Sequence, residues 1–174
     1  MLTAIGLIYL LFKTLKHYIK VNIGIHESHL QPLATLLNTL LADEYVLYTK
    51  TRNYHWNVTG PNFMELHKLF EGQYEQLDEN IDAIAERSRT LGHYAVATLK
   101  DFLAITRLTE DDKATNATDM LQNLLNDHET IIRILRNDIT DTAEKYKDVG
   151  TSDFLTGLLE QHEKTSWFIR AHLS

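Results

Sequence analysis

The sequence predicts a single all-helical domain, folded as a four-helix bundle with one long crossover connection. Apolar residues recur at helical spacing over four long segments, and no segment shows the strict alternation of a β-strand. Only two prolines and seven glycines occur in 174 residues, so long helices are permitted. A hydrophobic content of 44% is sufficient for one core in a chain of this length.

The first two helices are separated by a strong break. Apolar positions predict a first helix over about 31–56, and the turn-forming segment 57–61 ends it. Asn62 stands three residues before Glu65, a pattern typical of a helix N-terminus. The second helix is therefore expected to begin after Asn62 and to end at Gly92. The inward face of the first helix also carries polar residues, namely Glu44 and His55 among leucines.

A long connection follows the second helix. Within it, residues 95–102 have the pattern of a short helix, and the polar stretch 109–118 leads onward. A third long helix is expected over about 119–145, and residues 150–152 separate it from a fourth over 153–173. Four helices with one long connection between the second and the third describe a bundle with a crossover.

Charge divides the chain into two parts, an N-terminal extension over 1–20 and the bundle domain over 21–174. The extension carries Lys13, Lys16 and Lys20 without any acid, a formal +3. The bundle domain holds 14 basic and 24 acidic groups, a formal −10. Because such a body repels phosphate, any nucleic-acid contact is expected to be weak and to come through the extension.

The first twelve residues are almost wholly apolar, but they are too few to span a bilayer. No positive charge precedes them and no small-residue cleavage site is evident, so they resemble a signal peptide poorly. An extra amphipathic segment or an upstream start codon is the expected interpretation. A membrane-surface helix and an export signal are the alternatives. We therefore expect a cytoplasmic protein without membrane association.

The absence of cysteine leaves His, Asp and Glu as the available metal ligands, which suit iron, manganese or zinc.

On the second helix, His67 and Glu71 are four residues apart, as are Asp82 and Glu86. The eleven residues between Glu71 and Asp82 make nearly three turns, so all four groups share one stripe. Along the axis the two pairs stand roughly 16 Å apart, so one metal centre cannot join them on a single helix.

A second copy of the helix resolves this separation. The midpoint of the stripe lies between Gln76 and Leu77. If two copies pack antiparallel across a two-fold axis there, each histidine–glutamate pair faces the aspartate–glutamate pair of the other chain. His55 then completes each of two equivalent shared sites, which would suit one or two Fe(II) ions.

The alternative is that these charges form a solvated helix face and that the histidines are packed residues. Two acids one turn apart destabilise a helix unless a cation lies between them, which favours a site. No histidine has a glutamate three residues before it, so a di-iron centre inside one subunit is disfavoured. His26 and His29 are spaced wrongly for a metalloprotease motif, and a solvated leader is favoured there over a stray metal site.

At these residues the sequence resembles the Dps family of mini-ferritins. The last helix, over 163–173, is also similar to that family's, and the resemblance covers about 21–173. The resembling block consists of His55-Trp56-Asn57, Gly60, Asn62-Phe63, His67, Glu71-Gly72, Asp82, Ala85-Glu86-Arg87 and Leu91-Gly92. The resemblance implies a ferritin-like subunit, a hollow dodecamer and ferroxidase sites across its two-fold interfaces.

Carried over to this sequence, the family pattern implies that His55, His67 and Glu71 are iron ligands from one subunit. Asp82 and Glu86 would come from the partner subunit. Glu71 stands where many members have aspartate. The carboxylate is therefore kept on a longer side chain, and the affinity for iron can differ from that of those members.

Three further residues acquire roles through the resemblance. Trp56 resembles a tryptophan beside the iron site, a one-electron donor in catalysis or else an interface aromatic. Asp148 and Asp153 resemble acids that line an iron-entry pore at the three-fold axis, although Asp153 also suits the first turn of a helix.

The resemblance implies an enzyme, a ferroxidase. It would oxidise Fe(II) with hydrogen peroxide at an intersubunit site and store the Fe(III), protecting against oxidative damage. The alternative is a nucleoid DNA-binding protein with little ferroxidase role.

Overall fold

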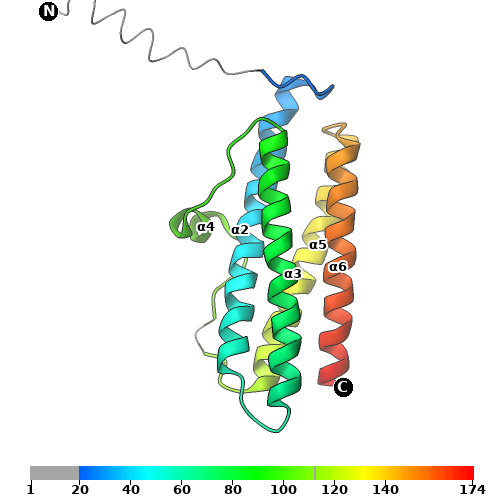
Figure 1. Cartoon of the computed structure of the whole chain (residues 1–174). Helices are drawn as coiled ribbons and strands as arrows, with labels where there is room; N and C mark the ends of the chain where they lie inside the picture. The colour runs from blue at the N-terminus through cyan, green and yellow to red at the C-terminus, as the bar shows by residue number, and fades with distance from the viewer. Residues whose placement is uncertain (1–19, 112) are drawn as a thin grey trace, which may run out of the picture.

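The structure is a computed structural model that describes residues 20–111 and 113–174, so the expectations for the segment before Lys20 lie outside it. Four long helices form a bundle, and a short helix lies on the crossover (Figure 1). No strand occurs within the described ranges. The predicted all-helical bundle with a crossover helix is confirmed. The helices are α2 (Glu27–Asn57), α3 (Phe63–Thr90), α4 (Leu99–Ile105), α5 (Ala117–Glu144) and α6 (Val149–Leu173).

Two helices begin four residues before their expected starts, because a polar side chain caps each of them. His26 precedes α2, and its ring nitrogen accepts a hydrogen bond from the Ser28 backbone N–H at 3.3 Å. Asp148 precedes α6, and its carboxylate accepts from the Thr151 backbone N–H at 3.0 Å. These caps satisfy amides that the first turn leaves without partners, and apolar periodicity does not reveal them. Gly150, expected to separate the helices, lies inside the first turn of α6.

The other boundaries differ less. Asn62 precedes α3 as expected, but its side chain makes no capping hydrogen bond. α4 begins after Thr98, whose side chain accepts from the Asp101 N–H, so it lies about four residues later than expected. Gly92 ends the α3 region with a φ of 86°, the left-handed conformation that favours glycine.

The core lies between two helix pairs, in which α2 packs along α3 and α5 packs along α6. Fully buried leucines from α2 and α5 fill its centre together with Phe70 and Ile84 of α3. α4 covers the outer side of α2, where Phe102 stacks on Tyr45 with ring centroids 4.4 Å apart. By contrast, α3 and α6 contact each other sparsely, which leaves a groove between them.

A buried carboxylate fixes the crossover onto α2. Asp43 is fully buried, and its oxygens accept from the Arg107 backbone N–H at 2.6 Å and from the Arg107 side chain at 2.7 Å. The Thr106 hydroxyl donates to the same carboxylate at 3.0 Å. One buried acid therefore satisfies three donors just beyond the end of α4.

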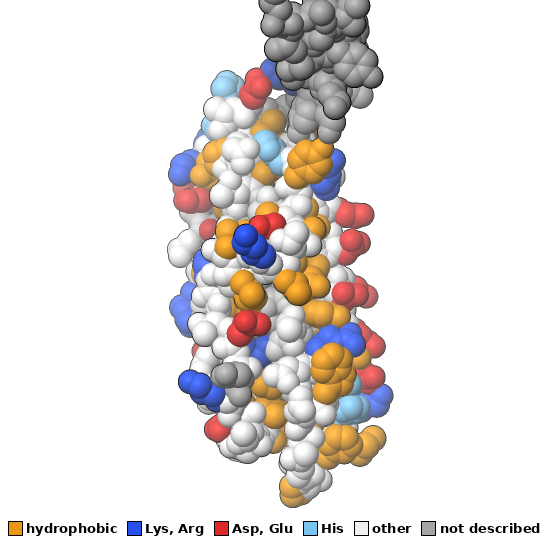
Figure 2. All heavy atoms as spheres, turned by 90° about the vertical axis from the view of Figure 1, so that its left-hand side faces the viewer, with side chains coloured by type: hydrophobic (Ala, Val, Ile, Leu, Met, Phe, Trp, Pro, Cys, Tyr) orange, Lys and Arg blue, Asp and Glu red, His pale blue; other side chains and the backbone are white. Residues whose placement is uncertain are grey.

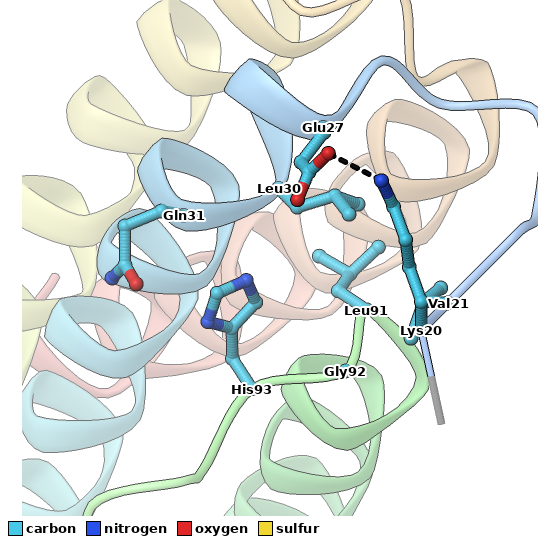
Figure 3. Close-up of a pocket in the computed structure, with 8 residues that line it drawn as sticks. All are labelled: Lys20, Val21, Glu27, Leu30, Gln31, Leu91, Gly92 and His93. Atoms are coloured by element: carbon cyan, nitrogen blue, oxygen red, sulfur yellow. Dashed lines mark hydrogen bonds and ion pairs between the residues drawn. The ribbon is translucent and has the colours of Figure 1, made fainter. Parts of the chain in front are cut away.

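A shallow pocket lies where the start of the described chain meets the end of α3 (Figure 3). Lys20 and Glu27 form an ion pair of 2.6 Å at its rim, and Val21 packs so closely on Gly92 that a Cβ there would lie 2.4 Å from it. The pocket is at the opposite end of α3 from His67, so it is remote from the residues expected to bind metal. Among the described residues, no helix combines the length and the apolar character that crossing a membrane requires.

Candidate metal centre

His55 and His67 face each other across the connection between α2 and α3. Their rings stack with centroids 3.7 Å apart and planes inclined by 21°. Nδ1 of His55 lies 2.8 Å from the carbonyl oxygen of His67, and Nδ1 of His67 lies 2.9 Å from the carbonyl oxygen of His55. The two residues thus hold each other by a pair of reciprocal hydrogen bonds, which we call the reciprocal lock.

These bonds fix the tautomer of both rings. A carbonyl oxygen can only accept, so each Nδ1 carries the proton and donates it. In the neutral ring, Nε2 is then left with a lone pair, the form in which imidazole binds a metal. Backbone carbonyls commonly orient metal-binding histidines in this way. The chain therefore presents two oriented imidazole nitrogens side by side.

The turn between the helices brings the histidines together. Gly60 has a φ of 118°, a backbone conformation that side chains disfavour, and the Phe63 N–H donates to its carbonyl at 3.1 Å. Val58, buried at the end of α2, anchors the turn to the core. The last turn of α2 is consequently placed beside the first turns of α3.

Glu71 lies one turn beyond His67 on α3. Its carboxylate pairs with Lys68, and this hydrogen bond is the main cause that lowers the pKa of Glu71. The two neighbouring histidines lower the same pKa further. Glu71 is therefore ionised at neutral pH and is available as an oxygen ligand.

Asp82 and Glu86 lie farther along α3 and are both exposed. Within the described ranges, neither side chain makes a hydrogen bond or an ion pair. At 1.5 Å per residue, Asp82 stands roughly 16 Å from Glu71 along the helix axis, and His67 lies farther away still. Figure 2 shows a column of acidic side chains along one long edge of the bundle. In the part of the chain that the structure describes, no three His, Asp or Glu side chains gather closely enough to hold a metal ion.

Trp56 projects from the end of α2 with 64% of its surface exposed. The Arg52 guanidinium lies 5.2 Å from its ring centre and 4.5 Å from that of Tyr74. Sequence reasoning missed Arg52, although its spacing of four residues from Trp56 is a readable signal. A large exposed indole beside the histidines suits an interface or an electron-transfer role equally well.

The two acids of the expected pore have different surroundings. Asp148 is buried, and its carboxylate accepts from Arg87 at 3.2 Å besides capping α6. Asp148 thus joins α6 to α3. Asp153 is exposed, and it lies beyond the first turn of α6. Of the two side chains, Asp153 is the one free to line a pore, and the pore itself stays a prediction.

Three further histidines have structural partners. His26 caps α2 and stays exposed, as expected of a solvated leader, whereas His29 is half-buried and donates from Nδ1 to the Tyr146 carbonyl at 2.9 Å. His162 was missed by sequence reasoning, and its Nε2 lies 2.7 Å from the buried Glu44 carboxylate.

The comparisons with known proteins agree with this architecture. Residues 34–174 match the ferritin-like domain family. A Bacillus anthracis protein named DNA protection during starvation protein 2 is 37% identical, covering 80% of this chain and 94% of its own. The crystal structure of a Dps protein from Bacillus brevis matches with a TM-score of 0.81 at 35% identity, covering 86% of this chain and 100% of its own. The chain belongs to the Dps family.

Two further relatives extend the comparison. A Dps protein from Vibrio cholerae O1, described as a member of the ferritin-like diiron-carboxylate proteins, matches with a TM-score of 0.83 at 32% identity. It covers 88% of this chain and 97% of its own. A low temperature-induced protein of Nostoc is 46% identical over 88% of this chain and 87% of its own. The resemblance to Dps is thus confirmed, whereas the roles of individual residues in this chain stay predictions.

Proposed function

We propose that this Dps-family protein is a ferroxidase that oxidises Fe(II) with hydrogen peroxide and stores the Fe(III) inside a dodecameric shell. The reciprocal lock between His55 and His67 carries the proposal, because it leaves two adjacent Nε2 lone pairs oriented for metal. If the two histidines served only for packing, their unprotonated Nε2 atoms would not need to lie side by side. Iron is the substrate and the cargo of this reaction.

In the proposed site, His55, His67 and Glu71 bind iron from one subunit. Asp82 and Glu86 of the partner subunit approach across a two-fold axis and supply the remaining carboxylates. Their mutual repulsion on a bare helix is relieved when a cation lies between them. Imidazole and carboxylate together suit an iron ion that must change its oxidation state.

The proposed chemistry transfers two electrons at one place. Each of two Fe(II) ions loses one electron, and peroxide accepts both as its O–O bond breaks and its oxygens take up protons as water. Because both electrons arrive together, the one-electron reduction that releases hydroxyl radical is avoided. If a site holds only one Fe(II), Trp56, which follows His55 in the chain, is the candidate donor of the second electron. Fe(III) then hydrolyses in the acidic interior, and Asp153 is the proposed acid of the entry pore.

The oxidant is tested by stoichiometry. We expect two Fe(II) to be oxidised for each hydrogen peroxide consumed, with little oxidation by dioxygen alone over the same time. Anaerobic Fe(II) oxidation with measured peroxide and a parallel run with dioxygen alone check this, and light scattering on the same sample gives the oligomer mass. A ferroxidase that works as a persistent monomer would contradict the shared site. Faster oxidation by dioxygen would contradict the choice of peroxide.

DNA binding is a second candidate function, favoured by the relatives named for DNA protection. The formal charge of −10 over 21–174 opposes it, so we expect weak duplex binding that falls steeply as salt rises. A gel-shift salt series should show that a chain starting at Val21 binds less than the full chain, which keeps the three lysines of the extension. Tight binding at physiological salt by the shortened chain would refute this expectation.

A further inference from the structure

Four buried polar side chains, one from each helix of the bundle, form a cluster in the core. These are Glu44 of α2, Gln73 of α3, His128 of α5 and His162 of α6, and their exposures are 0%, 7%, 2% and 2%. The centre of a bundle is otherwise filled by apolar side chains, and a polar group there is costly unless it has a partner. This cluster lies outside the proposed iron site.

Three of these residues form a hydrogen-bonded chain. Nε2 of His162 lies 2.7 Å from Oε1 of Glu44, and Nδ1 of His162 lies 2.8 Å from Nδ1 of His128. Because a carboxylate only accepts, Nε2 of His162 carries a proton. In the neutral ring Nδ1 of His162 then accepts, and Nδ1 of His128 donates. Nε2 of His128 is therefore left with a lone pair.

Among the described residues, this nitrogen and several polar atoms around it have no hydrogen-bond partner in the protein. Nε2 of His128, both amide atoms of Gln73 and Oε1 of Gln161 are buried without one. The three residues line a common cavity of about 10 Å³. This is close to the space that one water needs, and a water there would have the two to four polar partners that stabilise it. It would donate to His128 and Gln161 and accept from Gln73.

The cavity adjoins the groove between α3 and α6. Gln73 and Gln161 line both, and the groove is bordered outside by Lys68 and Lys164. Lys68 is the partner of Glu71. A polar route therefore runs from the carboxylate of the proposed iron site, along the groove, to the buried chain.

We propose that Glu44, His162 and His128 form a proton relay that takes up protons from the α3–α6 groove through one water in this cavity. The water gives a proton to Nε2 of His128 and regains one from the groove. His128 passes its Nδ1 proton to Nδ1 of His162, and His162 passes its Nε2 proton to Glu44. Each ring gains one proton and loses one, and the net result is a protonated Glu44.

The charges around the route distinguish protons from metal cations. Besides the relay itself, the charged groups that line the cavity and the groove are Lys68 of α3 and Lys164 of α6. They keep hydrated cations out, whereas a proton can pass along hydrogen bonds. Burial and the neighbouring His162 hold the pKa of His128 well below its usual value, so His128 carries protons without retaining them. Protonation of Glu44 removes a negative charge from the core.

The relay has a use in iron oxidation, and this part rests on the proposed function. Hydrolysis of Fe(III) releases protons, and their accumulation beside Glu71 would weaken its hold on the next Fe(II). Uptake through the groove would remove them during the first turnovers.

The relay is tested first without iron, on the assembled protein. After a rapid drop in pH, infrared difference spectra should show the C=O stretch of a buried, protonated carboxyl group. Glu44→Gln should abolish this band while keeping an acceptor for His162. The exposed Glu160→Gln is the matched control and should keep the band. Persistence of the band in Glu44→Gln, or its absence from the native protein, would overturn the proposal.

The route is tested by rates. His128→Phe and Gln73→Met each remove a polar group beside the water, so the band should appear at least about tenfold more slowly. Gln73→Met keeps the volume and lies outside the relay, so the test survives if His128→Phe does not fold. Unchanged rates in a folded variant, or anomalous scattering from a metal ion in the cavity, would refute the water route. Repeating the experiment with Fe(II) and peroxide tests only the coupling between the relay and iron oxidation. The pH-jump test needs no iron, so its result stands even if the protein is not a ferroxidase.

Discussion

Two inactive variants should regain roughly a quarter of the wild-type ferroxidase sites when they are unfolded together and reassembled. One variant carries Asp82→Asn and Glu86→Gln, and the other carries His67→Gln and Glu71→Gln. If every site takes one pair of ligands from each subunit, each pure oligomer lacks half of every site. A mixed interface has one complete site and one site without any of the four groups.

The fraction follows from random pairing. Half of the interfaces are then mixed, and each restores one site of two. Bias can shift this value, because the interface without Asp82 and Glu86 loses like-charge repulsion and self-associates more readily. Peroxide-dependent Fe(II) oxidation measures the recovery, and mass spectrometry of the intact oligomer confirms mixing.

Two controls sharpen the result. Each variant reassembled alone should remain inactive. A protein with Glu79→Gln and Glu160→Gln, which also loses two exposed acids, should keep wild-type activity. Mixed oligomers that regain no activity would exclude the shared site.

Asp43→Ala should reduce the free energy of unfolding by about 3 kcal/mol, near the lower end for breaking a buried ion pair. The change leaves the Arg107 and Thr106 donors without their acceptor. The Arg107 side chain is 33% exposed, so water compensates part of the loss. The crossover should then detach from α2 more readily than the bundle unfolds.

Asp138→Ala is the matched control, since Asp138 lies 3.8 Å from the same guanidinium and makes the weaker contact. It should cost less than about 1 kcal/mol. Urea unfolding at one fixed subunit concentration compares the two, because the stability of an oligomer depends on concentration. Hydrogen exchange should localise the Asp43→Ala effect to 99–108. Equal losses in both variants would show that Asp43 is not the anchor of the crossover.

Local patterns predicted the helices well because helical periodicity is a property of neighbouring residues. The starts of α2 and α6 were missed, since His26 and Asp148 cap them through side-chain chemistry that an apolar pattern does not contain. α4 was displaced for the same reason, because Thr98 determines where it begins. The bundle topology followed from the break at 57–61 and the long connection after α3.

The sequence predicts the candidate site only in part. The spacing of His67, Glu71, Asp82 and Glu86 on one helix is local and could be predicted. The reciprocal lock between His55 and His67 depends on the geometry of the turn, so the sequence did not reveal it. The Glu44–His162 contact joins residues 118 positions apart, and only tertiary packing brings them together.

The division of the ligands between two subunits also determines when a new chain becomes reactive. Both imidazoles are oriented by backbone carbonyls of their own chain, so this half of the site is complete as soon as α2 and α3 have folded. The carboxylates of the partner subunit arrive later, with assembly. On the proposed arrangement, a lone subunit leaving the ribosome therefore oxidises no iron, and oxidation begins only after a partner subunit has completed the site. Association of the subunits would then activate the ferroxidase.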